Sequence, residues 1–216
     1  EETIEVAGFE VDFGERAPKA HPLFQRFRIL ADIGNLLVNE PGRPPRKLTR
    51  GHHASIPHDE IAPFIEKLRE RQAESTAALM LEWIALTACR TGEARLGTWA
   101  EIDMGRMIWA IPATRMKMGR DHVVPITGRM AEILEEAQRR HGRKVKPGDY
   151  LFPGPREGKP FSEMAGIMQM KRMGYGQFTV HGLRATFKGW AATATEFPRE
   201  LIEEQLAHQL GAVERA

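Results

Sequence analysis

The apolar segment from Ser75 to Cys89 constrains the fold of this chain more than any other stretch of its sequence. Its side chains can be accommodated only in a protein interior, so the segment predicts a helix that is buried on every side. At 216 residues, the chain is long enough for one large domain, or one domain and part of another, to enclose such a helix. No apolar run in the sequence approaches the length of a membrane span.

The rest of the chain has the patterns of further helices and a small sheet. Amphipathic spacing predicts a helix over His58–Gln72. Met107–Pro112 and His122–Ile126 have the composition of strands, and the polar segment Thr114–Asp121 predicts a hairpin tip between them. We therefore expect a fold that is mainly α with a small antiparallel β-sheet. The other expected helices are Pro22–Val38, Glu93–Trp99, Thr127–Arg140, Ser162–Met173, Val180–Ala194 and Pro198–Ala207, with a third short strand over Tyr150–Phe152.

The N-terminal part of the chain differs in composition from the rest. Ile4–Phe13 fits either a short strand or an extended segment lying along the body. Glu40–His53 contains three prolines, two glycines, three arginines, one lysine and two histidines, which is typical of an extended basic linker. We therefore divide the chain into an N-terminal segment with its linker, residues 1–50, and a main domain, residues 51–216.

The charge balance limits what kind of nucleic-acid partner is possible. Lys and Arg total 31 against 29 Asp and Glu, so such a partner must meet local basic patches. Lys117, on the hairpin tip, is either a solvated turn residue or a mobile side chain that donates a proton in a site. The other basic residues of the tip and of the run after the Thr127–Arg140 helix are either merely solubilising or suited to DNA phosphates: Arg115, Arg120, Arg139, Arg143, Lys144 and Lys146.

Cysteine content and the N-terminus bear on the compartment. The single cysteine, Cys89, excludes an internal disulfide and fits a reducing environment. The first residues do not have the pattern of a signal peptide. We expect a cytoplasmic protein that does not associate with membranes.

Two arginines and two histidines are candidates for binding a phosphate group. His181 and Arg184 lie three residues apart, so a helix over them would point both side chains the same way. Arg90 has Glu93 one turn later, and His208 lies near the end of the chain. Guanidinium groups bind phosphate oxygens in pairs, and the histidines lack the spacing of a zinc site. The structural alternatives are an Arg90–Glu93 surface ion pair, a buried His181 and a solvated Arg184.

The order and spacing of these motifs resemble the catalytic domain of the tyrosine recombinases, also called phage integrases. The motifs are Arg90-Thr-Gly-Glu93, the hairpin Lys117, His181-Gly-Leu-Arg184 and Leu206-Ala-His208. The resemblance extends over about His52 to Ala216 and is greatest to the integrases of prophages and genomic islands. It implies the recombinase catalytic fold for residues 51–216, and it is compatible with residues 1–50 being the tail of a preceding DNA core-binding domain.

The resemblance also implies a role for each candidate residue. Arg90 and Arg184 would clamp the non-bridging oxygens of the scissile phosphate, and His181 would help to move the proton of the nucleophile. Lys117 would protonate the leaving 5′-oxygen, and His208 would donate to the developing charge. Glu93 would orient these side chains without contacting the phosphate itself.

Activity and partners follow from the same resemblance. The implied reaction is site-specific recombination through a 3′-phosphotyrosyl link, without a metal or nucleotide cofactor. The implied partners are duplex DNA attachment sites, three further copies of the protein in a homo-tetramer, and accessory DNA-bending proteins. The implied location is the bacterial nucleoid.

One feature departs from the family pattern. The family's nucleophilic tyrosine lies about nine or ten residues after the histidine that matches His208, and the sequence stops at Ala216. Tyr150 and Tyr175 both precede that histidine. We therefore expect residues 1–216 alone to be inactive in cleavage. One alternative is a non-catalytic DNA-binding module of the same fold. Another is a metal-dependent nuclease or phosphotransferase, which the lack of a carboxylate cluster disfavours.

Overall fold

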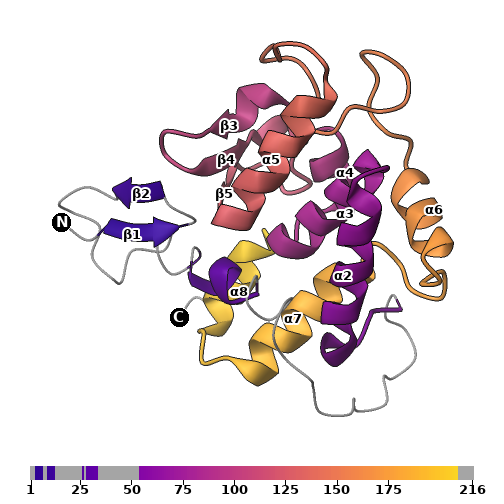
Figure 1. Ribbon diagram of the computed structural model, residues 1–216. Helices are drawn as coiled ribbons and strands as arrows, with labels where there is room; N and C mark the ends of the chain where they lie inside the picture. Colours follow the sequence, from indigo (N-terminus) through magenta and orange to yellow (C-terminus); the bar gives the residue numbers. More distant parts are fainter. Residues whose placement is uncertain (1–2, 7–8, 13–25, 27, 34–53, 209–216) are drawn as a thin grey trace.

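The computed structural model describes residues 3–6, 9–12, 26, 28–33 and 54–208 (Figure 1). Its centre is α3, Thr76–Thr87, in which every side chain from Ala77 to Thr87 is buried. The prediction of a fully buried helix is therefore confirmed. Trp83 of α3 packs edge-on against Trp109 and Phe152, with ring centroids 5.3 Å and 6.0 Å away.

Helices surround α3 on most of its sides, and a three-stranded sheet lies beside them (Figure 1). The sheet has the order β3-β4-β5 and is antiparallel throughout. The mainly helical fold with a small antiparallel sheet is thus as predicted. The helices are α2 (Ile61–Gln72), α4 (Thr91–Arg95), α5 (Gly128–Arg140), α6 (Ala165–Arg172), α7 (Gly182–Ala194) and α8 (Arg199–Gln205), and the strands are β3 (Ile102–Asp103), β4 (Ile108–Ile111) and β5 (His122–Pro125).

The sheet differs from the prediction in its third strand. Tyr150–Phe152 is not a strand: Tyr150 makes one isolated bridge to Thr98, while Leu151 and Phe152 fill the core from a loop. The third strand is β3, which pairs with β4 and is only two residues long. A segment that short has no measurable alternation, so its sequence carries no strand signal. The N-terminal segment forms a separate hairpin of β1 (Thr3–Val6) and β2 (Phe9–Asp12).

Several helix boundaries also differ from the prediction. The single helix expected over Glu93–Trp99 is instead α4 followed by a 3-10 turn, Trp99–Glu101. The break falls at Gly97, where a Cβ would approach Leu151 to 2.9 Å, so the chain can turn tightly against the core there. Pro198 lies at the N-cap of α8 rather than in its first turn. Thr127 occupies the N-cap of α5 without a side-chain capping bond.

A buried carboxylate ties three helices together. Glu82 of α3 is fully buried and accepts hydrogen bonds from Arg69 of α2 at 2.8 Å and from Arg129 of α5 at 2.8 Å and 3.0 Å. Burial opposes its ionisation, but the contacts with Arg129 and Arg69 outweigh that effect and lower its pKa. The ion pairs thus keep a charge inside an otherwise apolar helix.

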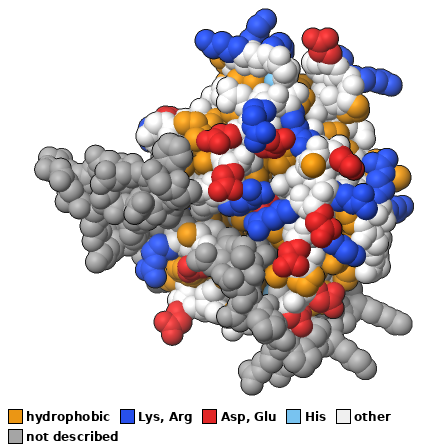
Figure 2. All heavy atoms as spheres, viewed as in Figure 1, with side chains coloured by type: hydrophobic (Ala, Val, Ile, Leu, Met, Phe, Trp, Pro, Cys, Tyr) orange, Lys and Arg blue, Asp and Glu red, His pale blue; other side chains and the backbone are white. Residues whose placement is uncertain are grey.

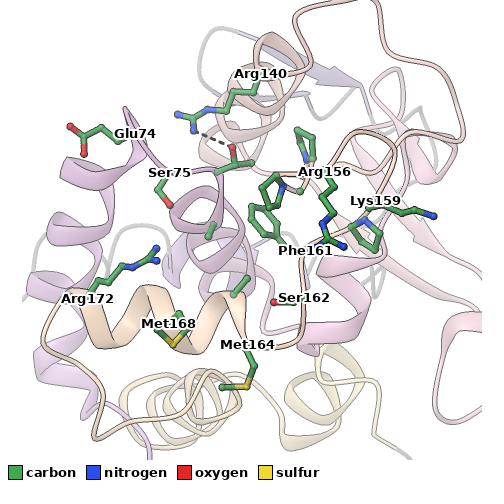
Figure 3. A pocket seen from close by; sticks show the side chains of 17 residues that line it. Glu74, Ser75, Arg140, Arg156, Lys159, Phe161, Ser162, Met164, Met168 and Arg172 are labelled. Carbon is green, nitrogen blue, oxygen red and sulfur yellow. Dashed lines mark hydrogen bonds between the residues drawn. The ribbon is translucent and has the colours of Figure 1, made fainter.

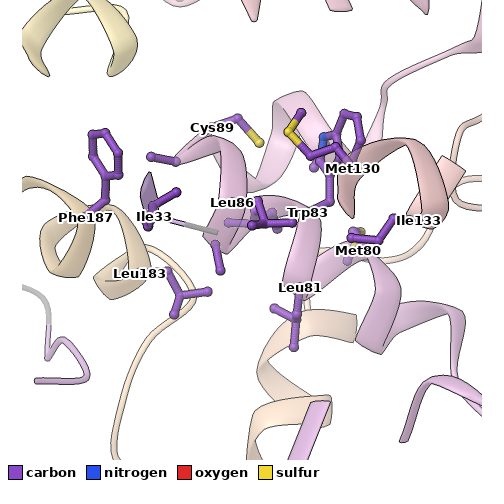
Figure 4. Close-up of a cluster of buried hydrophobic side chains, with 14 of the residues drawn as sticks. Ile33, Met80, Leu81, Trp83, Leu86, Cys89, Met130, Ile133, Leu183 and Phe187 are labelled. Carbon is purple, nitrogen blue, oxygen red and sulfur yellow. The ribbon is translucent and has the colours of Figure 1, made fainter. Parts of the chain in front are cut away.

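The core includes residues from the N-terminal segment. Residues 26 and 28–33 are helical, and Ile29, Leu30 and Ile33 are buried in the same hydrophobic cluster as Leu183 and Phe187 of α7 (Figure 4). The predicted helix over Pro22–Val38 is described only for these residues, and the predicted linker lies outside the described residues. Composition, on which the division at residue 50 rests, does not report that residues 29–33 pack against α7. None of the described helices is both long and apolar enough to span a membrane.

Candidate active site

Arg184 lies where the ends of α3, α7 and α8 meet. Its side chain is buried, and its guanidinium donates from Nη1 to the carbonyl of Ala88 and from Nη2 to that of Leu206, the latter at 2.7 Å. Ala88 has a φ of 51°, a left-handed conformation that ends α3. Two carbonyls from segments far apart in sequence therefore hold one arginine, and that arrangement fixes the direction of its guanidinium.

Arg90 is held in place by Glu93, which lies three residues later in the same motif. The backbone N–H of Arg90 donates to one carboxylate oxygen of Glu93 at 2.7 Å, and its Nη1 donates to the other at 2.7 Å. Glu93 is buried, whereas 22% of the Arg90 side chain is exposed. This pair is more constrained than the surface ion pair of the structural alternative, because the carboxylate also caps the start of α4.

The two arginines influence each other electrostatically. Burial lowers the pKa of Arg184, and the positive charge of Arg90 lowers it further. Two cations that are close enough for one to lower the pKa of the other repel each other. An anion that binds between them relieves this repulsion. A phosphodiester is such an anion.

His208 completes this cluster from the end of α8. Its Nε2 lies 3.4 Å from Nη2 of Arg184, and its Nδ1 lies 2.6 Å from a carboxylate oxygen of Glu203. Glu203 is buried and was not singled out by the sequence analysis. The sequence feature that could have identified Glu203 is its position in the predicted Pro198–Ala207 helix, five residues before His208.

His181 and Arg184 lie at the same end of α7 and differ in exposure. His181 is the N-cap of α7 and is exposed, whereas Arg184 lies in the first turn and is buried. The backbone of His181 is itself helical, with a φ of −64° and a ψ of −29°, and the expectation that the two side chains point the same way stays a prediction. The carbonyl of His181 accepts the backbone N–H of Arg184 at 3.1 Å, so the imidazole belongs to the same helix end.

Lys117 lies on the hairpin, a different part of the fold from the helix ends that carry Arg90, Arg184 and His208. It is exposed in the turn between a 3-10 turn, Ala113–Arg115, and β5. Gly119, two residues on, has a φ of 61°, which allows the tight reversal at the tip. The hairpin prediction is confirmed for this segment.

A buried polar network behind the cluster was missed by the sequence analysis. Arg26 donates to the side chain of Gln205 at 3.0 Å, and Gln205 donates to the carbonyl of Thr87 at 2.8 Å. The Arg26 guanidinium also lies 3.5 Å from Nε2 of His122. Burial, with the charges of Arg26, Arg184 and Arg90, lowers the pKa of His122 to about 3. The sequence signal for this network was that Arg26, His122 and Gln205 are each a polar residue within a predicted helix or strand.

Arg115 was predicted to contact DNA, but its guanidinium points into the protein. It pairs with the buried carboxylate of Glu101 and donates to the carbonyl of Glu93 at 2.5 Å. Glu101 also accepts from the indole of Trp109 at 2.9 Å. Arg115 therefore links the hairpin to α4, because an unpaired Glu101 would be costly at that depth.

The other basic residues of the prediction are exposed. Arg139 pairs with Glu136 at 2.5 Å, and Arg143 makes two bonds to Asp149 at 2.7 Å and 2.9 Å. In the view of Figure 2, Lys and Arg side chains gather over the loop that follows α5, while elsewhere on this face both signs are mixed. The exposed residues are Arg120, Arg139, Arg143, Lys144 and Lys146.

A cavity of roughly 1030 Å³ lies at the opposite end of α3 from Arg90 (Figure 3). Its lining includes Arg140, which donates to Thr76 at 3.2 Å and to the carbonyl of Gln72. None of the predicted catalytic residues lines it. Within the described part of the chain, no group of His, Cys, Asp and Glu side chains is arranged to hold a metal ion.

Comparison with known proteins identifies relatives of this chain. Residues 54–212 match the phage integrase family. The chain is 35% identical over 159 residues to prophage integrase IntZ of Escherichia coli K12, which covers 73% of this chain and 38% of that relative. It is 31% identical over 169 residues to prophage integrase IntA of the same strain, which covers 77% and 40%. The matched part is therefore less than half the length of these relatives.

Solved structures share the fold at low sequence identity. XerA recombinase superimposes with a TM-score of 0.59 at 18% identity, covering 80% of this chain and 60% of that chain. A lambda integrase dimer bound to a COC' core site gives a TM-score of 0.57 at 14% identity, covering 78% and 48%. A lambda integrase tetramer bound to a Holliday junction gives 0.55 at 14% identity, covering 90% and 59%. With the family match and the two relatives above 30% identity, these likenesses lead to one conclusion: the chain belongs to the phage integrase family.

Proposed function

We propose that residues 51–216 form the phosphate-binding part of a site-specific DNA recombinase that cleaves and rejoins strands through a 3′-phosphotyrosyl link. The observation that carries this proposal is the contact of Arg184 with His208 at 3.4 Å, with Arg90 near enough for its charge to lower the pKa of Arg184; the three residues come from separate parts of the chain. Arg184 is held by two carbonyls, so little reorganisation is needed when a phosphate binds.

The proposed roles follow from charge and exposure. Arg90 and Arg184 bind the non-bridging oxygens, where negative charge gathers in the transition state. His181, at the exposed N-terminus of α7, adds a donor at a helix end that already favours anions. Glu93 holds Arg90 in place.

In the proposed step, a tyrosine oxygen bonds to phosphorus as its proton passes to His181, and the bond from phosphorus to the 5′-oxygen breaks. Lys117, on the exposed hairpin tip, gives that oxygen its proton. The phosphodiester energy is kept in the new tyrosyl–phosphate bond, so the reverse attack by a 5′-hydroxyl reseals DNA without ATP. No metal or nucleotide takes part in the proposed step.

The proposed partners are duplex attachment sites and other copies of the protein. The structurally similar lambda integrase was solved as a dimer on a core site and as a tetramer on a Holliday junction. By analogy, we propose a homo-tetramer on DNA, with accessory DNA-bending proteins. The exposed basic residues after α5 would supply phosphate contacts that are independent of sequence.

The test is a cleavage assay with end-labelled suicide DNA that carries the attachment site. Residues 1–216 should not cleave, whereas a chain extended through the tyrosine expected after Ala216 should form a covalent adduct by a 3′-phosphate. In that longer chain, Arg184→Ala should slow cleavage by about 3–4 kcal/mol of activation free energy. Arg71→Ala, at an exposed arginine of α2, is the matched control.

Two results would reject the proposal. Site-specific binding by the extended chain without any adduct would favour a non-catalytic DNA-binding module. Cleavage that EDTA abolishes would point to a metal-dependent nuclease instead.

A further inference from the structure

Glu203 is a buried carboxylate with both oxygens engaged. One oxygen accepts from Nζ of Lys188 on α7, and the other lies 2.6 Å from Nδ1 of His208. The backbone also joins the pair, since the N–H of His208 donates to the carbonyl of Glu203 at 2.9 Å. Burial opposes ionisation of Glu203, but the hydrogen bonds from Lys188 and His208 outweigh it and lower its pKa.

An ionised carboxylate determines which nitrogen of His208 carries the proton. Such a carboxylate can only accept hydrogen bonds, so Nδ1 of His208 must be the donor. In the neutral ring, Nε2 is then an acceptor, and it faces Nη2 of Arg184 at 3.4 Å. The contacts therefore run in one direction, from Arg184 through His208 to Glu203.

The turn after α8 brings this chain of contacts to Arg184. Ala207 has a φ of 49°, a left-handed conformation that a non-glycine residue rarely adopts. With that turn, the carbonyl of Leu206 and the ring of His208 both reach Nη2 of Arg184. Glu203 is the group that holds the ring on the far side.

We infer that Glu203 is a positioning residue for the reaction, acting through His208. In the DNA-free protein it fixes His208 in the Nδ1–H form and turns its Nε2 toward Arg184, while Lys188 holds the second oxygen of the carboxylate. In that form Nε2 accepts from Arg184, and it is not the donor to the phosphate that the resemblance implies for His208. The arrangement itself is a property of residues 1–216, whereas its importance for strand cleavage rests on the proposed function.

The first measurement needs no activity. Long-range ¹H–¹⁵N NMR of residues 1–216 at pH 7.5, with His208 assigned from the His208→Gln spectrum, should show Nδ1 protonated and Nε2 unprotonated. In Glu203→Gln, the amide can donate as well as accept, so the ring should shift toward the Nε2–H form that free imidazoles prefer. Glu204→Gln, at the exposed neighbouring carboxylate, should leave the His208 spectrum unchanged. Circular dichroism checks that each variant is folded.

The second measurement is single-turnover cleavage by the extended chain. Glu203→Gln should lower the rate at saturating DNA by roughly 10- to 100-fold, with little change in DNA affinity. Because Glu203 acts through His208, adding Glu203→Gln to His208→Ala should cause no further loss.

The inference is overturned if His208 is Nε2-protonated or doubly protonated in the wild type, or if Glu203→Gln leaves its spectrum unchanged. It is also overturned if the losses from Glu203→Gln and His208→Ala multiply. If the unmodified extended chain forms no adduct at all, the proposed function fails, and the NMR result still decides whether Glu203 sets the His208 tautomer.

Discussion

His122 is a neutral histidine that the fold has removed from water at the start of β5. It lies beside the guanidinium of Arg26, and burial together with nearby arginines keeps its pKa near 3, against an ordinary value of 6.5. The unfolded chain takes up a proton at this residue as the pH falls below 6.5, and the folded chain does not. Stability from His122 is therefore complete above pH 6.5 and decreases as the pH falls toward 3.

We predict that the free energy of unfolding falls by up to about 1.4 kcal/mol per pH unit below pH 6.5 because of His122. His122→Gln keeps an acceptor for Arg26 but cannot titrate, so it should reduce this slope. Urea unfolding at pH 7.5, 6.5, 5.5 and 4.5 measures it. Identical slopes for the two proteins would show that His122 titrates alike in the folded and unfolded chains.

Substitutions of Arg115 and of the lysines after α5 should distinguish a charge with a structural role from charges that contact DNA. Lys144→Ala with Lys146→Ala should weaken binding to duplex DNA of any sequence. Each lost phosphate contact should make the slope of log K against log salt shallower by about 0.9. Arg115→Ala should instead lower the free energy of unfolding by about 1–3 kcal/mol, because Glu101 loses its buried partner.

Fluorescence anisotropy across a salt series and urea unfolding test this pair of variants together. An unchanged salt slope for the double lysine variant would show that Lys144 and Lys146 do not contact DNA. An Arg115→Ala protein as stable as the wild type would contradict the structural role.

At the scale of elements, the start of α7 is positioned by contact with the segment before α2. Thr179 donates its backbone N–H to the carbonyl of Ala54 at 3.0 Å, and the hydroxyl of Thr186 donates to that of Ile56 at 2.6 Å. Gly182 lies between them, and a Cβ there would meet the Ala54 oxygen at 2.2 Å. The close approach that presents His181 at the helix end therefore requires a glycine.

Gly182→Ala should destabilise the protein by about 1–3 kcal/mol, because the clash is with backbone that cannot rotate away. Gly189→Ala on the same helix is the matched control, since a Cβ there meets nothing within 4 Å. That control should stabilise the protein by about 0.5–1 kcal/mol, as expected for an exposed helix interior. Thermal unfolding of both variants is the measurement, and equal effects of the same sign would contradict the packing described here.

At the scale of the whole molecule, the question is whether residues 28–33 belong to the cooperative core. Leu30 is fully buried there, and Asp32, two residues on, is exposed. Leu30→Ala should cost about 2–5 kcal/mol in the free energy of unfolding. Asp32→Ala should change it by less than about 0.5 kcal/mol. A loss near zero for Leu30→Ala would show that this segment is not part of the folded unit.

Local pattern was enough to predict much of this fold. The apolar run of α3 required a buried helix, the spacing of apolar residues in α2 and α5 required amphipathic ones, and the hairpin of β4 and β5 followed from its polar tip. The motifs around Arg90 and Arg184 pointed to a phosphate site before any geometry was known. The inferences about the fold succeed because composition and period report how a residue relates to neighbours within one or two turns of chain.

Only the tertiary structure decided the partners of the buried polar groups. Nothing near Arg184 in the sequence indicates that Ala88 and Leu206 supply its acceptors, or that Glu203 lies behind His208. Arg115 read as a surface charge because its buried partner, Glu101, is fourteen residues away. A charge taken out of water must find a partner wherever packing brings one, and packing joins elements irrespective of their distance along the chain.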